Sequence, residues 1–192
     1  LTNYKTDKKK VLFNNERYLK TDHINPYLVP APDIWIENRT NKPYNNMPKM
    51  TTGSPPTDGG GLLLTVEEKD YLLKKYPILE KYIKPFIGAR EFLHDTIGTF
   101  SRYCLWFKNA NPSDFKDIPE IKERLEKVRA LRLKSNADRI QKMAVYPYLF
   151  CQIRQPSSDY LVIPRHSSEK RKYIPIGYMN PGVIAGDACT TT

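Results

Sequence analysis

The densest group of side chains able to carry charge or form hydrogen bonds is Arg165-His166-Ser167-Ser168-Glu169-Lys170-Arg171. The pair Arg154-Gln155 precedes it in the chain. Arginine and lysine can bridge the O6 and N7 atoms of guanine, glutamine can pair with adenine, and serine commonly reaches phosphate. These residue types therefore indicate contacts with nucleic acid, although a solvent-exposed hairpin would show the same pattern.

The sequence lacks the common catalytic motifs. The sequence has no phosphate-binding Gly-x-x-x-x-Gly-Lys-Ser/Thr loop, no Gly-x-Ser-x-Gly turn and no His-Glu-x-x-His helix, and its three histidines are isolated. Ser54-Pro55-Pro56-Thr57 resembles the tetrapeptide with which amino-methyltransferases hold a flipped base, but Thr57 replaces the stacking ring. We therefore expect no catalytic residue, no bound cofactor and no metal site in this chain.

The 3 cysteines, Cys104, Cys151 and Cys189, fit neither a disulfide framework nor a zinc knuckle. A reducing cytoplasm is the simplest compartment for such a chain. No apolar run approaches the roughly 18 residues that span a bilayer, so no membrane association is expected. The chain begins at Leu1 rather than methionine, which suggests a segment of a longer protein.

The net charge of +10 over 192 residues favours a polyanion or an acidic surface as the partner. The largest surplus lies in residues 117–192, with 13 basic and 8 acidic side chains. Many of these cations lie on a predicted helix over residues 118–144, whose apolar positions Ile121, Leu125, Val128 and Leu131 follow the helical period. A solvated basic surface without a specific partner would also fit the charge.

The remaining pattern predicts an α+β fold, with a mixed or antiparallel sheet packed on one long basic helix and a short helical pair. Thr65 and Glu68 form a capping box that begins the helical pair over residues 65–84. Strands are predicted at residues 11–13, 33–37, 102–108, 148–154, 159–164 and 172–176, an extended proline-bounded stretch at 25–30, and a long irregular loop at 38–61.

Several stretches, taken in chain order, carry a family pattern: Ile24-Asn25-Pro26-Tyr27-Leu28, Pro48-Lys49-Met50, Asp58-Gly59-Gly60, residues 82–92, Arg102-Tyr103-Cys104-Leu105-Trp106, Ile153-Arg154-Gln155-Pro156 and residues 159–177. Together they resemble the target recognition region of the MmeI-like DNA methyltransferases. The resemblance covers nearly the whole chain and is more specific than any single motif in it.

In that family a nuclease, a helical connector, an adenine methyltransferase domain, a recognition domain and a helical tail form one polypeptide. The resemblance implies that residues 1–22 connect to a preceding methyltransferase domain and that residues 23–192 form the recognition domain. It implies double-stranded DNA and the methyltransferase domain as partners, with S-adenosylmethionine bound elsewhere in the parent protein. The parent would methylate adenine, with or without nuclease activity.

On this interpretation, the expected DNA contacts are Arg154, Gln155, Arg165, Ser167, Ser168, Lys170 and Arg171, with Lys49, Arg90, Arg129 and Arg132 as further phosphate contacts. Two other hypotheses remain open. A complete small enzyme would need the missing catalytic residues. A protein-protein interaction module with a basic face would bind an acidic partner, and preference for one duplex sequence over a scrambled one would separate it from DNA recognition.

Overall fold

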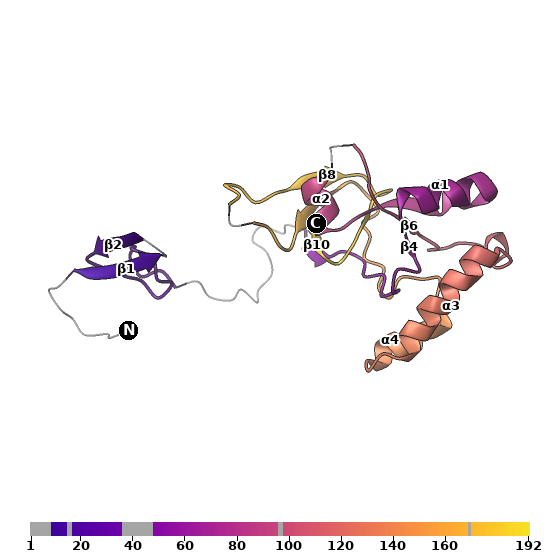
Figure 1. The fold of residues 1–192 in the computed structure, drawn as a ribbon, viewed down its shortest axis with the longest axis horizontal. Coiled ribbons are helices and arrows are strands. Elements are labelled where there is room, and N and C mark those ends of the chain that lie inside the picture. Colours follow the sequence, from indigo (N-terminus) through magenta and orange to yellow (C-terminus); the bar gives the residue numbers. More distant parts are fainter. Residues whose placement is uncertain (1–8, 15–16, 36–47, 96–97, 169) are drawn as a thin grey trace. The chain divides into compact units, whose positions relative to one another are not determined.

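The computed structural model describes residues 9–14, 17–35, 48–95, 98–168 and 170–192 of the chain. The chain divides into two compact units, Leu1–Tyr44 and Asn45–Thr192, which we call the N-terminal and C-terminal units (Figure 1). Among the described residues, no helix is long and apolar enough to cross a membrane.

The N-terminal unit contains a two-stranded hairpin of β1 (Lys10–Asn14) and β2 (Arg17–Thr21). Phe13 and Tyr18 lie opposite each other in the antiparallel register, with ring centroids 6.4 Å apart. The strand predicted at residues 11–13 is therefore confirmed within β1. The stretch predicted to be extended at 25–30 is instead a turn, because the Asn25 side chain accepts hydrogen bonds from two backbone N–H groups that follow it. Residues 33–35 form no strand, and residues 36–37 lie outside the described residues.

The C-terminal unit is an α+β domain, as predicted. Its strands are β3 (Thr51–Thr52), β4 (Leu63–Leu64), β5 (Ile83–Ile87), β6 (Tyr103–Leu105), β7 (Tyr160–Pro164), β8 (Gly177–Met179), β9 (Ile184–Ala185) and β10 (Cys189–Thr191). Its helices are α1 (Val66–Lys75), α2 (Ala89–His94), α3 (Pro119–Leu133) and α4 (Asp138–Lys142), with 3-10 helices η2 (Pro77–Lys81), η3 (Pro112–Asp114) and η4 (Met143–Val145).

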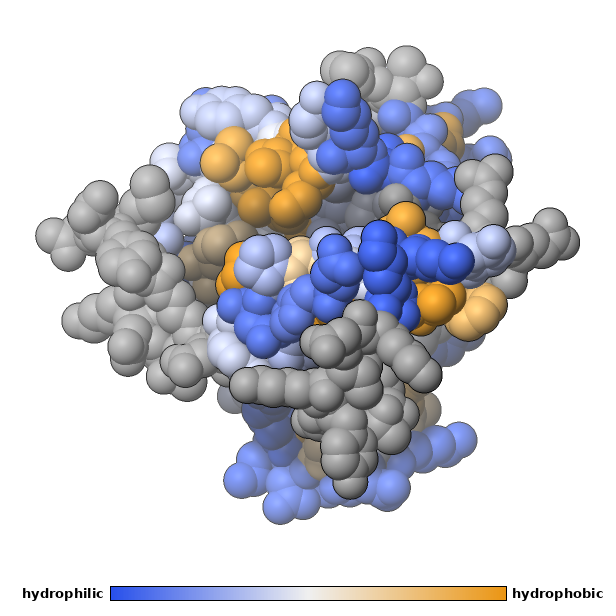
Figure 2. All heavy atoms as spheres, turned by 90° about the vertical axis from the view of Figure 1, so that its left-hand side faces the viewer, coloured by the Kyte–Doolittle hydropathy of each residue, from blue (hydrophilic) through white to orange (hydrophobic). Residues whose placement is uncertain are grey.

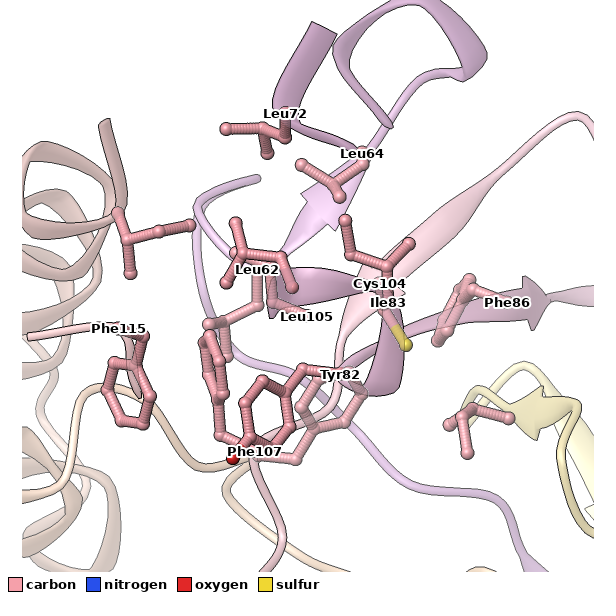
Figure 3. Close-up of a cluster of buried hydrophobic side chains, with 14 of the residues drawn as sticks. Leu62, Leu64, Leu72, Tyr82, Ile83, Phe86, Cys104, Leu105, Phe107 and Phe115 are labelled. Carbon is pink, nitrogen blue, oxygen red and sulfur yellow. The ribbon is translucent and has the colours of Figure 1, made fainter. Parts of the chain in front are cut away.

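The main hydrophobic core is built around the sheet β4-β6-β5-β9, which we call the core sheet. Its pairings are antiparallel except for β5 with β9, which is parallel. Figure 3 shows Leu62, Cys104 and Leu105 at the centre of this cluster. The ring of Phe107 stacks on Phe115, with centroids 4.1 Å apart. The strand predicted at residues 102–108 is thus a central strand of the core sheet, although its ladder is limited to β6.

A second sheet, β3-β10-β7-β8, is antiparallel throughout, and we call it the outer sheet. One of its sides covers a smaller apolar cluster that includes Ile87, Tyr160, Val162 and Val183. β10 lies between β3 and β7, so the outer sheet joins segments from both ends of the C-terminal unit. The predicted strand at 159–164 is confirmed as β7.

Helices α1 and α3 begin where the sequence predicts, but α3 ends earlier than predicted. Thr65 Oγ1 accepts a hydrogen bond from the Glu68 N–H at 3.2 Å, and the Glu68 carboxylate accepts one from the Thr65 N–H at 2.9 Å, which confirms the capping box. Pro119 is the first residue of α3, but α3 ends at Leu133 instead of continuing to about residue 144. Ser135 ends the helical pattern, because its hydroxyl accepts a hydrogen bond from the Ala137 N–H and its carbonyl accepts one from the Gln141 side chain of α4.

Two strands predicted in the C-terminal unit are wrong. Residues 148–154 form no ladder, because their aromatic side chains pack into the main core, where the Phe150 ring meets the Trp106 ring at 4.9 Å between centroids. Residues 172–176 are also irregular, and β8 begins only at Gly177. Pro175 has no N–H to donate to a ladder, which is consistent with this late start.

Candidate nucleic-acid interface

The outer sheet has one side that is not covered by its apolar cluster. Alternate residues of β7 are buried, whereas Leu161 between them is 37% exposed. Directly opposed residues of an antiparallel ladder point to the same side. The register therefore places one set of side chains on the open side, which we call the exposed sheet face: Tyr178 and Leu161 as one pair, and Ile163, Thr190 and Thr52 as one row.

Arg154 lies at one edge of this exposed sheet face. Its backbone N–H donates a hydrogen bond to Ser54 Oγ at 2.9 Å, and its guanidinium donates one to the Thr52 hydroxyl. Ser54 is fully buried and its own N–H donates to the Ala185 carbonyl at 2.7 Å. Arg154 is thus held at the sheet edge through a buried serine while its side chain remains exposed.

Gln155 is used by the fold itself. Its side-chain NH₂ donates to the carbonyls of Val183 at 2.7 Å and Pro181 at 3.2 Å, and its side-chain oxygen accepts from the Ala185 N–H at 3.1 Å. Tyr160 donates its hydroxyl to the same Val183 carbonyl at 2.6 Å. The amide predicted to contact DNA therefore fastens the β9 region to the segment that carries Arg154 in this structure.

Arg165 lies at the same end of the outer sheet as Arg154. Its N–H donates to the Ala188 carbonyl at 2.9 Å, and its guanidinium donates to the Asp187 carbonyl at 3.2 Å. The strands next to Arg154 and Arg165, β3 and β7, flank β10 on its two sides. Two strand spacings amount to roughly 10 Å, so the two arginines lie on one continuous surface.

The β7–β8 loop, residues 165–176, projects from this end of the sheet. Figure 1 shows it as the gold loop beside β8 and β10, on the side of the C-terminal unit away from α3 and α4. Every described loop residue is exposed except Pro175, which is half-buried. Ser168 shapes the loop, since its hydroxyl accepts from the Lys170 N–H at 3.2 Å and its carbonyl accepts from the Arg171 N–H at 3.1 Å.

The loop is strongly basic. The sequence places four cations, Arg165, Lys170, Arg171 and Lys172, against the single acid Glu169. Within the described part of the chain, the side chains of Lys170 and Arg171 have no ion-pair partner. Both residues are exposed, so their charges are placed to meet an anion at the surface.

The base of the loop packs on α2. The ring of Phe92 lies so close to Gly177 that a Cβ there would come within 2.4 Å of it. Beside this contact is a pocket of about 530 Å³, lined by Arg171 and Ile176 from the loop and by Phe92 and Phe100 from the other side. The returning arm of the loop is consequently tied to the body of the domain.

Three predicted phosphate contacts lie elsewhere. Lys49 is exposed at the opposite end of the outer sheet, since it precedes β3 next to Pro48, whose carbonyl accepts from the Thr192 hydroxyl. Arg90 is exposed on α2, which packs on the covered side of the sheet. Arg129 is exposed on α3, on the far side from the loop (Figure 1). The structure does not gather these three with Arg154 and Arg165.

Arg132 is a correction to the predicted phosphate contacts. Its side chain is 0% exposed, and its guanidinium donates to five backbone carbonyls at 2.7–3.1 Å. These acceptors belong to Pro56, Thr57, Met143, Tyr146 and Leu149. Burial lowers the pKa of Arg132 from its usual value. A fully buried side chain whose donors are all directed at backbone carbonyls cannot reach a phosphate.

Sequence reasoning missed the residues that make the exposed sheet face, above all Thr52 and Tyr178. β3 has only two residues, so no period-two pattern could be seen there. A signal for Arg132 did exist, because it falls four residues after the buried Val128 on the inward stripe of α3. Ser54-Pro55-Pro56-Thr57 also has a structural role, since its carbonyls are acceptors for Arg132.

The remaining ionisable groups do not add a reactive centre to this surface. Burial raises the pKa of Cys189 to about 12 and that of Cys104 still further. Within residues 9–14, 17–35, 48–95, 98–168 and 170–192, no group of three or more His, Cys, Asp and Glu side chains is placed to hold a metal ion.

The fold and the surface define a basic α+β domain with an exposed sheet face and a cationic loop at one end of the outer sheet. The chain belongs to the MmeI target recognition domain family, whose model matches residues 30–192. It is 38% identical over 175 residues to DNA methyltransferase A of Bacillus subtilis (strain 168), covering 91% of this chain.

A solved structure is similar over nearly the whole chain. It is that of the Type IIL restriction-modification enzyme MmeI in complex with DNA, with 36% sequence identity and a TM-score of 0.84 over 97% of this chain. The chain spans 19% of the length of the Bacillus relative and 25% of the solved MmeI chain. Both relatives thus contain far more polypeptide than the domain described here.

Proposed function

We propose that this domain recognises a specific sequence in double-stranded DNA for a larger DNA methyltransferase or restriction-modification enzyme, and positions the duplex for adenine methylation by a separate catalytic domain. The observation that carries the proposal is the β7–β8 loop with its exposed Lys170 and Arg171, beside the anchored Arg154 and Arg165. Family membership and the DNA complex of a similar enzyme support it.

Phosphate contacts would come from the loop. Lysine and arginine that neutralise phosphates release condensed counterions, which gives affinity and register without sequence information. Arg165, Lys170 and Arg171 can serve in this way because they are exposed and clustered. Ser167 and Ser168 are exposed in the same loop, where their hydroxyls can also contact phosphate.

Base contacts would come from the sheet edge. Arg154 is exposed and its backbone is fixed to the buried Ser54, so its guanidinium starts from a defined position when DNA approaches. Gln155 would contribute indirectly, by holding the segment that carries Val183 and Ala185. Lys49, Arg90 and Arg129 would contact DNA only where the duplex extends beyond the loop.

The domain would be part of one longer polypeptide, which would work in the cytoplasm. S-adenosylmethionine would bind to the methyltransferase domain, where it supplies the methyl group, and the residues of this chain would orient DNA toward it. We further propose that residues 1–22 connect to that domain and that residues 23–192 form the recognition domain. The family model matches from residue 30, and the compact C-terminal unit begins at Asn45.

The test is the binding of the chain to random duplex DNA, measured by fluorescence anisotropy at about 50 and 200 mM salt. We expect binding that weakens steeply with salt and that falls in Arg165→Ala and Lys170→Ala. Matched controls are Lys122→Ala on α3 and Arg139→Ala on α4, which remove exposed cations on the side away from the loop. These controls should bind like the unsubstituted chain.

Sequence preference separates DNA recognition from the alternative of a protein-interaction module with a basic face. After selection from a random duplex pool, the chosen sequence should bind more tightly than its scrambled version, by a factor that survives an increase in salt. Equal affinity for both duplexes would contradict sequence recognition and leave only a nonspecific basic surface.

A further inference from the structure

Two apolar side chains project from the most basic loop of the domain. Apolar groups are exposed at several places among hydrophilic ones (Figure 2). Tyr173 and Ile174 are among the most exposed apolar residues, at 75% and 74% relative exposure. Exposing a tyrosine next to an isoleucine leaves apolar area in water that burial would stabilise, so these two residues are candidates for contact with a partner.

The loop geometry directs this pair outward. On the returning arm, Pro175 and Ile176 line the pocket against α2, and Gly177 packs on the Phe92 ring. Tyr173 and Ile174, immediately before them, do not line the pocket. The half-buried Pro175 and Gly177 therefore hold the arm, while Tyr173 and Ile174 are exposed beyond it.

The surroundings of the pair indicate which partner it meets. Lys170, Arg171 and Lys172 precede Tyr173 directly, and the Lys172 Nζ lies over the Tyr173 ring at 5.4 Å from its centroid. An apolar tip flanked by three cations fits a partner that has a charged border and an apolar interior. A groove of duplex DNA has this arrangement, with phosphates along its borders and base edges, thymine methyls and sugars inside.

We propose that Tyr173 and Ile174 enter a groove of the duplex and supply a salt-independent part of the affinity, while Lys170, Arg171 and Lys172 bind the phosphates that border it. The inference rests on the proposed function and adds an apolar contact to it. The two kinds of contact differ in their response to salt, because only the cations release counterions when DNA binds.

The experiment measures the dissociation constant for one selected duplex at four salt concentrations between about 50 and 300 mM. Tyr173→Ala and Ile174→Ala should each weaken binding about tenfold at every concentration, with an unchanged slope of log affinity against log salt. Lys170→Ala should instead reduce that slope by about 1. Val145→Ala is the matched control, because Val145 is 72% exposed and lies near α4, away from the loop.

Folding is checked by thermal unfolding, in which the substitutions at exposed positions should leave the melting temperature unchanged. If the unsubstituted chain binds with the expected salt dependence but Tyr173→Ala and Ile174→Ala bind equally well, the apolar contact is wrong and the proposed function stands. If Tyr173→Ala or Ile174→Ala changes the slope of log affinity against log salt, the proposed division between apolar and ionic contacts is wrong. Absence of binding by the unsubstituted chain would overturn both proposals.

Discussion

Arg132 Nη2 donates a hydrogen bond to the carbonyl oxygen of Pro56 at 2.9 Å, across 76 residues of sequence. The same nitrogen also donates to the Leu149 carbonyl at 2.7 Å. The segment that begins with Thr52 and Ser54 beside Arg154 therefore continues directly into the acceptors of Arg132. One buried side chain in α3 fastens the loop that supports the edge of the exposed sheet face.

Removing the Arg132 guanidinium should destabilise the domain strongly. In Arg132→Met, five backbone carbonyls lose the donor that the buried guanidinium supplies, and we expect the free energy of unfolding to fall by about 3–5 kcal/mol. Urea denaturation followed by circular dichroism measures this change. Arg129→Ala removes an exposed arginine of the same helix and should change stability by no more than about 0.5 kcal/mol. Equal effects of the two substitutions would contradict the role assigned to Arg132.

Gln155→Glu tests whether the amide serves the fold. The substitution keeps an oxygen that can accept from the Ala185 N–H, but it sets a second oxygen against the carbonyls of Pro181 and Val183. We expect a loss of stability of about 1–3 kcal/mol, because the donor to those carbonyls is gone. Hydrogen exchange should show faster opening of residues 181–185. A variant with unchanged stability and altered base preference would instead assign Gln155 to direct DNA contact.

Gly53→Ala should disturb the junction between β3 and β9. A Cβ at Gly53 would lie 2.3 Å from the Gly186 carbonyl oxygen and 2.5 Å from that of Ala185. Because both neighbours are backbone atoms, the strand must shift, and we expect a loss of about 1–3 kcal/mol in thermal or chemical unfolding. Gly182→Ala is the control, since its nearest neighbour is the Asn180 side chain at 3.0 Å. The control should unfold close to the unsubstituted chain.

The three cysteines should differ in reactivity toward a thiol reagent. Cys104 and Cys189 are fully buried, and burial raises the pKa of Cys189 to about 12, so neither forms thiolate near pH 8 while the domain is folded. Cys151 is only half-buried. Titration of the native chain should therefore give one fast equivalent, and denaturant should release the other two. Three fast equivalents in the native state would contradict the packing of both sheets.

Glu120 should make stability depend on acid. The Lys75 ammonium, at 2.5 Å, and the hydroxyl of Tyr76 lower the pKa of Glu120 from 4.5 to about 2. The stabilising contribution is complete above pH 4.5 and is lost as the pH falls toward 2. In Glu120→Gln this contribution is absent, so unfolding free energy should decline less over that range. Parallel curves for the two proteins would mean that the ion pair does not persist in solution.

Local signals predicted the element starts well. The Thr65–Glu68 capping box and Pro119 at the start of α3 depend on neighbouring residues only, and both are present as expected. The end of α3 was harder to predict. Residues after Leu133 include more residues typical of helices, whereas Ser135 forms a turn that competes with the helix. The α+β class was also predictable, because assigning it requires only which segments are helices and which are strands, and not how the strands pair.

Pairing could not be predicted from local pattern. Residues 148–154 alternate in a way typical of a strand, yet the main core takes up their aromatic rings without a ladder. The row from Ile163 through Thr190 to Thr52 joins three distant segments, two of which are very short. Basic residues were likewise predicted by type, but only the tertiary structure decides that Arg132 points inward while Arg165 remains exposed.

The position of β9 and β10 near the C-terminal end of the domain bears on the order in which the domain folds. β9 completes the core sheet through its parallel pairing with β5, and β10 is the central link of the outer sheet. During synthesis, β5 and β7 each have an unpaired edge until residues 184–191 have left the ribosome. Such long-range pairing is slow and exposes the chain to aggregation. The exposed sheet face would therefore be among the last parts of this domain to form.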